Sequence, residues 1–262
     1  MSFVRKGDNI MTKNNISKNF IETFEPLMTS NSFMRKGKVF HRIVNGKVIQ
    51  LVSYYSFFMA RNFTIQFLIA PLCLGYEFDS NFHGSRLEEK FRGKVTSWFY
   101  DGTEGYKEYM PIALKATENL LLPKLNNEID YESYYRSYRE SEVFTRAKRS
   151  LIKYKLALVF EDYEDAHEVM EEKYRYWCEV NMEKFGTEYH KDPERQESFE
   201  QDFNMHIQIK KAIENNDRKT IEEYISALEQ KSLNSYVKTY STPKKYEKFL
   251  ETGVLPFDIV YI

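Results

Sequence analysis

SFMRKGKVFHRIVNGKVIQLVSYYSFFMARNFTIQFLIA, residues 32–70, predicts three strands of one antiparallel sheet in chain order. Lys38–Val44 and Lys47–Tyr55 are rich in Val, Ile, Phe and Tyr. Between them lies Asn45-Gly46, a dipeptide that accepts positive φ at both central positions of a type I′ hairpin turn. Apolar and polar residues alternate in Phe63–Ala70, which is the period-two pattern of a half-buried strand. The stretch therefore predicts a β-meander.

The segment before the meander has the periodicity of a helix. Its apolar residues recur at spacings of three and four in NISKNFIETFEPLM, namely Ile16, Phe20, Ile21, Phe24, Leu27 and Met28. We expect this apolar stripe to lie on the sheet, and we expect residues 1–15 to form a polar tail.

This helix, the phrase SFMRKGKVFHRI and the strand VIQLVSYYS resemble the bacterial proteins grouped as domain-of-unknown-function family 4304. The likeness continues through a strand (KVTSWFY), a helix ending in LLLPKL and an aromatic helical segment (YESYY), so it covers roughly residues 16–140. The resemblance implies a cytoplasmic bacterial α+β domain. It brings no activity, ligand or catalytic residue with it.

Composition predicts a folded protein in a reducing compartment. A chain of 262 residues with 16% aromatic side chains has ample material for a packed core. Cys73 and Cys178 lie far apart, each in an apolar setting, which favours buried thiols over a disulfide. No apolar run approaches the eighteen or so residues that span a bilayer. We therefore expect a cytoplasmic protein without a membrane partner.

The pattern changes after Pro123, where strand-like alternation gives way to helical periodicity. We place a boundary near residue 127, between an α+β sheet domain (16–127) and a helical subdomain (128–262). Helices are expected to begin at Asp162 and at Asp192-Pro193, and Asn215-Asn216-Asp217 predicts a break before a further helix. The final GVLPFDIVYI predicts an edge strand or a packed tail. The fold class is thus α+β, with an N-terminal helix on an antiparallel meander followed by helical hairpins.

An acidic helix offers the first set of chemically capable side chains. Four residues share one face at helical spacing, namely Glu164, His167, Glu168 and Glu171. Carboxylates with one imidazole can bind a divalent metal. The set lacks the second His of a zinc HExxH helix, so a solvated acidic face is the favoured interpretation and no cofactor is expected.

A basic, tyrosine-rich segment, YYRSYRESEVFTRAKRSLIKYK, precedes the acidic helix. Arginines among tyrosines can contact phosphates and stack on bases. However, residues 128–262 hold 21 basic and 28 acidic side chains, whereas nucleic-acid-binding domains are usually basic. We therefore expect the basic and acidic helices to pair with each other.

Other catalytic signatures are missing from the sequence. It has no G-x-S-x-G elbow, and its ten glycines form no phosphate-binding loop. Cys73 follows Pro71 in an apolar run that would stabilise a thiolate poorly. His41 lies between Val39 and Ile43 on a predicted strand, so we expect it to be a side chain on the face of the sheet.

These observations favour a non-enzymatic protein that binds another protein, such as an accessory or immunity-type factor. The predicted interaction surface is the segment richest in tyrosine and arginine, which are enriched in interface hot spots: Tyr131, Tyr134, Tyr135, Arg136, Tyr138 and Arg139. Equal weight goes to the interpretation that these tyrosines are core. The alternative functions are a metal-dependent hydrolase with a site assembled from distant residues and a nucleic-acid-binding protein.

Overall fold

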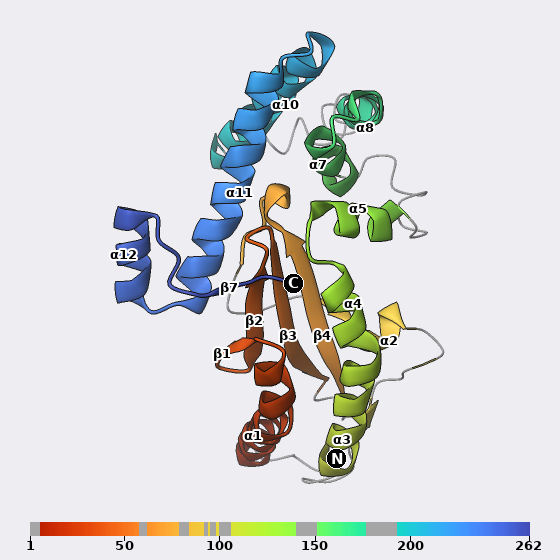
Figure 1. Ribbon diagram of the computed structural model, residues 1–262, viewed down its shortest axis with the longest axis vertical. Helices are drawn as coiled ribbons and strands as arrows, with labels where there is room; N and C mark the ends of the chain where they lie inside the picture. Colours follow the sequence, from red (N-terminus) through yellow and green to blue (C-terminus); the bar gives the residue numbers. More distant parts are fainter. Residues whose placement is uncertain are drawn as a thin grey trace. The chain divides into compact units, whose positions relative to one another are not determined.

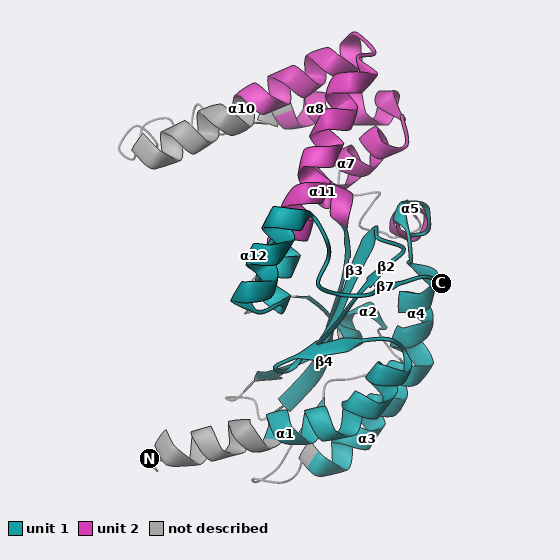
Figure 2. Ribbon diagram, turned by 60° about the vertical axis from the view of Figure 1, so that its left-hand side comes forward, with its two compact units in different colours: residues 1–71, 78–133, 234–262 teal, residues 72–77, 134–233 magenta. Residues whose placement is uncertain are grey.

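The computed structural model describes residues 6–57, 62–78, 84–91, 94, 98–99, 106–139, 151–176 and 193–262. The chain forms two compact units, one of residues 1–71, 78–133 and 234–262 and the other of residues 72–77 and 134–233 (Figure 2). The first contains an antiparallel sheet with helices, and the second is helical. The predicted α+β class is confirmed.

The sheet of the first unit is a meander. Its strands follow the order β1 (Met34–Lys36), β2 (Val39–Val44), β3 (Val48–Phe57), β4 (Asn62–Pro71) and β5 (Ser85–Arg86), each antiparallel to its neighbour (Figure 1). β6 (Trp98–Phe99) also pairs with β4. The chain end returns as β7 (Ile259–Val260), parallel to β2, so the predicted edge strand is found.

The turn between β2 and β3 has the geometry that its dipeptide predicts. The φ angle is +50° at Asn45 and +64° at Gly46. Lys47 N–H donates to Val44 O at 3.0 Å, and Val44 pairs with Val48 in the ladder. Two successive residues at positive φ define the tight type I′ connection.

Helices cover both faces of the sheet. On one face, the Phe20 ring of α1 (Lys6–Ser30) lies 5.7 Å from the Phe40 ring of β2. On the other face, His41 Nδ1 lies 2.7 Å from Tyr236 Oη of α11 (Arg218–Tyr240). Because successive strand residues point to opposite faces, these two contacts place the sheet between two helical layers.

Burial on both faces changes one expectation from the sequence. The predicted apolar face of β4 is buried, namely Phe63, Ile65, Phe67 and Ile69. Thr64 and Gln66 are buried as well, although the alternation predicted a solvent-facing side. Both sides of β4 are therefore covered, which a period-two pattern cannot reveal.

The helical layer with α1 is completed by α3 (Tyr106–Ala116), a single π turn η2 (Thr117–Leu121) and α4 (Leu122–Asn127), which follow one another without a break. α1 buries the predicted stripe at Ile16, Phe20, Phe24 and Met28. It begins at Lys6 rather than at residue 16, because residues 8–15 contain no Pro or Gly to stop it. The short α2 (Leu87–Lys90) and α12 (Pro243–Thr252) complete the helices described in this unit.

The second unit is a set of packed helices. It holds most of α5 (Tyr131–Arg139), α7 (Leu151–Val159), α8 (Tyr163–Tyr176), α10 (Pro193–Glu214), the first part of α11 and the short η1 (Leu72–Leu74). Its core is formed by residues of four helices: Tyr154, Ala157, Leu158, Ala166, Val169, Met170, Ile209, Ala212, Ile213 and Ile221.

The same turn joins both helical hairpins of this unit. Between α7 and α8, Glu161 has φ +55° and Asp162 N–H donates to Ala157 O at 2.9 Å. Between α10 and α11, Asn216 has φ +51° and Asp217 N–H donates to Ala212 O at 2.8 Å. In each turn a left-handed residue ends one helix, and an Asp caps the next. The predicted hairpins are therefore present.

Candidate functional site

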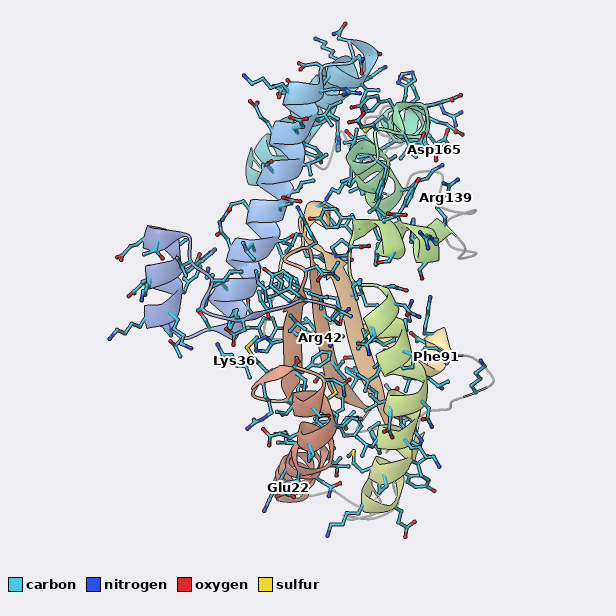
Figure 3. The ribbon with its side chains drawn as sticks, viewed as in Figure 1. Glu22, Lys36, Arg42, Phe91, Arg139 and Asp165 are labelled. Carbon is cyan, nitrogen blue, oxygen red and sulfur yellow. The ribbon has the colours of Figure 1, made fainter. Side chains whose placement is uncertain are left out.

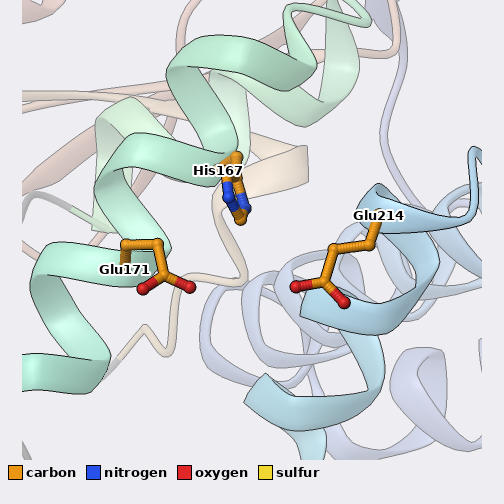
Figure 4. A group of neighbouring side chains, drawn as sticks. All are labelled: His167, Glu171 and Glu214. Atoms are coloured by element: carbon orange, nitrogen blue, oxygen red, sulfur yellow. The ribbon is translucent and has the colours of Figure 1, made fainter.

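A histidine and two glutamates meet in the second unit. His167 and Glu171 lie one turn apart on α8, and Glu214 is the last residue of α10. One ligand atom of each side chain lies within 4.8 Å of the others (Figure 4). Imidazole nitrogens and carboxylate oxygens are ligands for zinc and similar divalent ions. The three side chains therefore form a candidate metal site.

Lys210 already supplies a cation to this cluster. Its Nζ forms an ion pair with Glu171 and lies 3.8 Å from Glu214 Oε1. The pKa of the Glu171 carboxyl is lowered, first by its hydrogen bond with Lys210. A divalent ion would have to displace the ammonium group, because both bind the same carboxylates. The present geometry is an ion-pair network that joins α8 to α10.

Two of the four predicted ligands belong to the cluster. Glu164 and Glu168 are exposed and lie outside it, whereas His167 and Glu171 are members. His167 Nδ1 is buried and has no hydrogen-bond partner among the residues that the structure describes. Glu214 was not predicted as a ligand, because it comes from another helix. The sequence feature that could have drawn attention to it is its position directly before the Asn-Asn-Asp break.

An ion pair between described residues joins the basic and acidic runs, as expected. Lys153 Nζ of α7 lies 3.3 Å from Asp165 Oδ1 of α8, and both side chains are less than a third exposed. Figure 3 labels Asp165, the acidic member of this pair, and Arg139, the last residue of α5. Arg146 and Arg149, which carried much of the predicted basic charge, lie outside the described residues.

Tyr135, at the centre of the predicted interaction surface, is a core residue of the second unit. It is 7% exposed, and its ring stacks on that of Phe160 with 5.1 Å between centroids. The guanidinium of Arg139 lies 5.5 Å from the same ring centroid. Burial is the main cause that raises the pKa of the Tyr135 phenol. This ring is not available at the surface.

The other tyrosines of the segment are half-buried. Tyr134 and Tyr138 stack with their centroids 6.4 Å apart and their planes 5° from parallel. Tyr131, at the start of α5, has the ammonium group of Lys47 5.1 Å from its ring centroid. Arg136 is exposed. The structure therefore places the two predicted arginines, rather than the rings, at the surface of this segment.

A different surface lies on the first unit, over the outer side of α3 and η2. An open hollow of about 530 Å³ is lined by Lys94, Pro111, Ile112, Lys115, Ala116, Asn119 and Leu120. We call these residues the α3–η2 face. Ile112 is 54% exposed, whereas the opposite side of the same helix buries Met110, Ala113, Thr117 and Leu121. Pro111 and Ile112 are thus exposed apolar residues on a helix whose other side already packs into the core.

The α3–η2 face carries two cations. Lys94 and Lys115 are exposed, and no ion pair or side-chain hydrogen bond links either of them to another residue within the described ranges. The acidic residues of the same helix, Glu108 and Glu118, do not line the hollow. Sequence reasoning missed this face. The sequence feature that could have predicted it is the apolar pair Pro111-Ile112, which lies outside the stripe of residues that the same helix buries.

His41 offers little chemistry. His41 is 2% exposed, and its ring lies between Tyr236, Tyr240 and Phe257. Burial lowers the pKa of this imidazole to about 4, and Lys36 contributes to the same shift. His41 is therefore neutral and enclosed, as its predicted place on a sheet face indicates. His83 and His190 lie outside the described residues, as does Cys178, whereas Cys73 is a buried free thiol.

Comparison with family models, with curated proteins and with solved structures finds no match to this chain. None of the helices in the described part of the chain has the length and apolar character needed to cross a bilayer.

Proposed function

We propose that the protein is a non-enzymatic interaction factor, of the accessory or immunity type, that binds another protein through the α3–η2 face. One observation carries the proposal. An apolar row, Ile112 with Ala116 and Leu120, lies on the outer side of α3 and η2, although the inner side of the same helix is already buried in the core. A large apolar side chain that stays exposed on a helix with a complete buried stripe is suited to contact with a partner.

Local geometry supports the same surface. η2 is a π turn. Such turns are rare in proteins, and those that occur are often found at functional sites. Asn119 and Leu120 belong to this turn and also line the hollow. The α3–η2 face replaces the Tyr/Arg segment as the proposed docking surface, because the Tyr135 ring is buried in the core and cannot contact a partner. The likeness to family 4304 is compatible with this proposal and adds no activity to it.

The test compares two exposed apolar residues of the first unit. Ile112 lies on the α3–η2 face, and Leu250, 56% exposed, lies on α12. Tagged wild type, Ile112→Asp and Leu250→Asp are used to capture partners from cells that produce the protein. We expect a protein that the wild type and Leu250→Asp retain and that Ile112→Asp loses. Both variants should unfold within about 0.5 kcal/mol of the wild type.

A result in which folded Ile112→Asp retains every wild-type partner would contradict the proposal. Both substitutions place one carboxylate on an exposed helix, so a general effect of added charge would appear in both variants. A selective loss therefore reports on the α3–η2 face itself.

A metal-dependent hydrolase is the second candidate, and the juxtaposition of His167, Glu171 and Glu214 favours it. Zn²⁺ or Mn²⁺ at a hundred times its Kd would stabilise the native protein by about 2.7 kcal/mol. His167→Ala would abolish that gain, and Lys210→Gln would increase metal affinity by removing the competing ammonium. If neither ion raises the melting temperature of the wild type or of Lys210→Gln, this candidate fails.

A further inference from the structure

We infer that the partner of the α3–η2 face is an amphipathic helix with carboxylates beside its apolar stripe. The inference rests on the proposed function and names the chemistry of the partner. Its basis is the combination of apolar residues at helical spacing with two lysines that form no ion pair with any of the described residues.

The spacing of the apolar residues suits a helix. Ile112, Ala116 and Leu120 follow one another at intervals of four, beside a parallel row of Pro111, Lys115 and Asn119. Rows of this kind form the ridges and grooves into which a second helix packs. Residues 111–120 span about 14 Å along the axis, or about two and a half turns of a partner.

The order of side-chain sizes favours close approach. Ala116 has a short side chain and stands between the larger Ile112 and Leu120, so the middle of the row is lower than its ends. A large apolar residue of a partner helix can occupy that depression, with its neighbours at three and four positions contacting the two ends.

The two lysines determine the charge of the partner. Among the described residues, Lys94 and Lys115 are the charged ones that line the hollow, and Glu108 and Glu118 of the same helix lie outside the lining. A bound helix would bring its flanking side chains to these ammonium groups. Carboxylates at those flanks would form ion pairs, whereas lysines there would meet like charge.

Other anionic ligands fit the face less well. Small-molecule sites bury most of their ligand, but Ile112 is 54% exposed and the hollow is open. Recognition of anionic lipids commonly uses clusters of four to eight basic residues, and phosphate backbones use several contacts as well. Two lysines are too few for either polyanion, whereas they are enough for one helix.

The experiment uses the whole chain and two synthetic helical peptides of about 18 residues. Both carry the same leucine stripe; in one the flanking positions are Glu, and in the other they are Lys. Binding is followed by fluorescence anisotropy at low and at high salt. We expect the wild type to bind the Glu peptide about tenfold more tightly than the Lys peptide, because two surface ion pairs contribute about that factor, and the difference should shrink with salt.

Variants of the lysines and of Ile112 separate this inference from the proposed function. The double variant Lys94→Glu, Lys115→Glu should reverse the preference, and Ile112→Asp should bind neither peptide. A matched double variant at two exposed lysines elsewhere, Lys244→Glu and Lys248→Glu, should keep the wild-type preference.

Three results overturn the inference. They are equal binding of both peptides, no binding of the Glu peptide by the wild type, and binding of vesicles with 30% phosphatidylserine that the two lysine substitutions abolish. If cellular partners are still lost with Ile112→Asp in any of these cases, the proposed function stands and only the acidic helix is wrong.

Discussion

The Nη2 group of Arg42 donates a hydrogen bond of 2.8 Å to Asn126 Oδ1 and thereby joins strand β2 to the end of helix α4. Arg42 also donates from Nη1 to Asn31 O, just beyond α1, and from Nε to Gln50 Oε1, each at 2.8 Å. Figure 3 shows its place in the sheet. The side chain is 2% exposed, so this is a buried cation held by neutral oxygens.

Two helix ends explain how the charge is tolerated. α1 ends at Ser30 and α4 at Asn127, so the guanidinium lies where the partial negative charge of each helix dipole is concentrated. Burial lowers the pKa of Arg42 to about 10, which leaves it charged at neutral pH. Arg42 therefore fixes two helices to the sheet without a carboxylate among these acceptors.

Arg42→Lys should lower the free energy of unfolding by about 2 kcal/mol or more. An ammonium group cannot donate in the fork geometry that serves three separated acceptors, so buried acceptors lose their donors. Urea denaturation of the purified protein measures the change. Arg35→Lys is the control, because exposed Arg35 pairs with Glu25 at 2.8 Å and should change stability by no more than about 0.5 kcal/mol. Equal effects of both substitutions would show that the network is dispensable.

Gly46→Val should destabilise the first unit by about 1 kcal/mol or more. Gly46 has φ +64°, and a β-branched residue resists that region of backbone space. A Cβ at this position would meet Ile259 Cδ1 at an ordinary 3.7 Å, so the cost comes from the backbone rather than from a clash. The midpoint of denaturation checks it. Gly46→Asn is the control and should be better tolerated, since Asn accepts positive φ.

The hairpin illustrates which features sequence predicts well. Asn45-Gly46 and the strands beside it are local signals, because each depends on residues only a few positions apart. The same holds for the Asp caps of α8 and α11, whose donors lie three residues away. Such features need no knowledge of the rest of the fold.

Features that depend on distant residues were missed. Glu214 approaches His167 only because α10 packs on α8, and no period in the sequence reports that contact. The return of residues 234–262 to the sheet likewise makes His41 a buried residue of a two-sided sheet. The exposed apolar residues of α3, Pro111 and Ile112, were not predicted, because an apolar residue in a helix is usually assigned to the core.

Stability should fall as the pH drops from about 6.5 to about 4, and His41 should account for part of that fall. Its folded pKa is about 4, below the ordinary 6.5, so the unfolded chain binds the proton more readily in this window. The contribution is complete above pH 6.5 and is lost progressively as the pH falls toward 4, to a maximum of about 3 kcal/mol.

The measurement is urea denaturation of wild type and His41→Gln between pH 4 and pH 8. Glutamine does not titrate, so the stability of the variant should decline less steeply between pH 6.5 and pH 4.5, where most carboxylates are still ionised. Identical slopes for the two proteins would mean that folding does not lower the pKa of His41. Lys36, which contributes to the lowered pKa, donates hydrogen bonds to Thr239 O and Ser241 O.

Tyr135→Ala should cost about 3 kcal/mol or more of unfolding free energy, whereas Arg136→Ala should cost less than about 0.5 kcal/mol. The Tyr135 ring is 7% exposed and stacked on Phe160, so its removal leaves a cavity in the second unit, whereas Arg136 at the next position is exposed. Thermal and urea denaturation of the two neighbouring variants measure this contrast.

Partner capture with the stable Arg136→Ala variant then tests the segment as an interaction surface. Because the proposed docking site is the α3–η2 face, we expect Arg136→Ala to retain every partner. Loss of a partner from this folded variant, with Ile112→Asp still retaining it, would return the interaction to the tyrosine-rich helix.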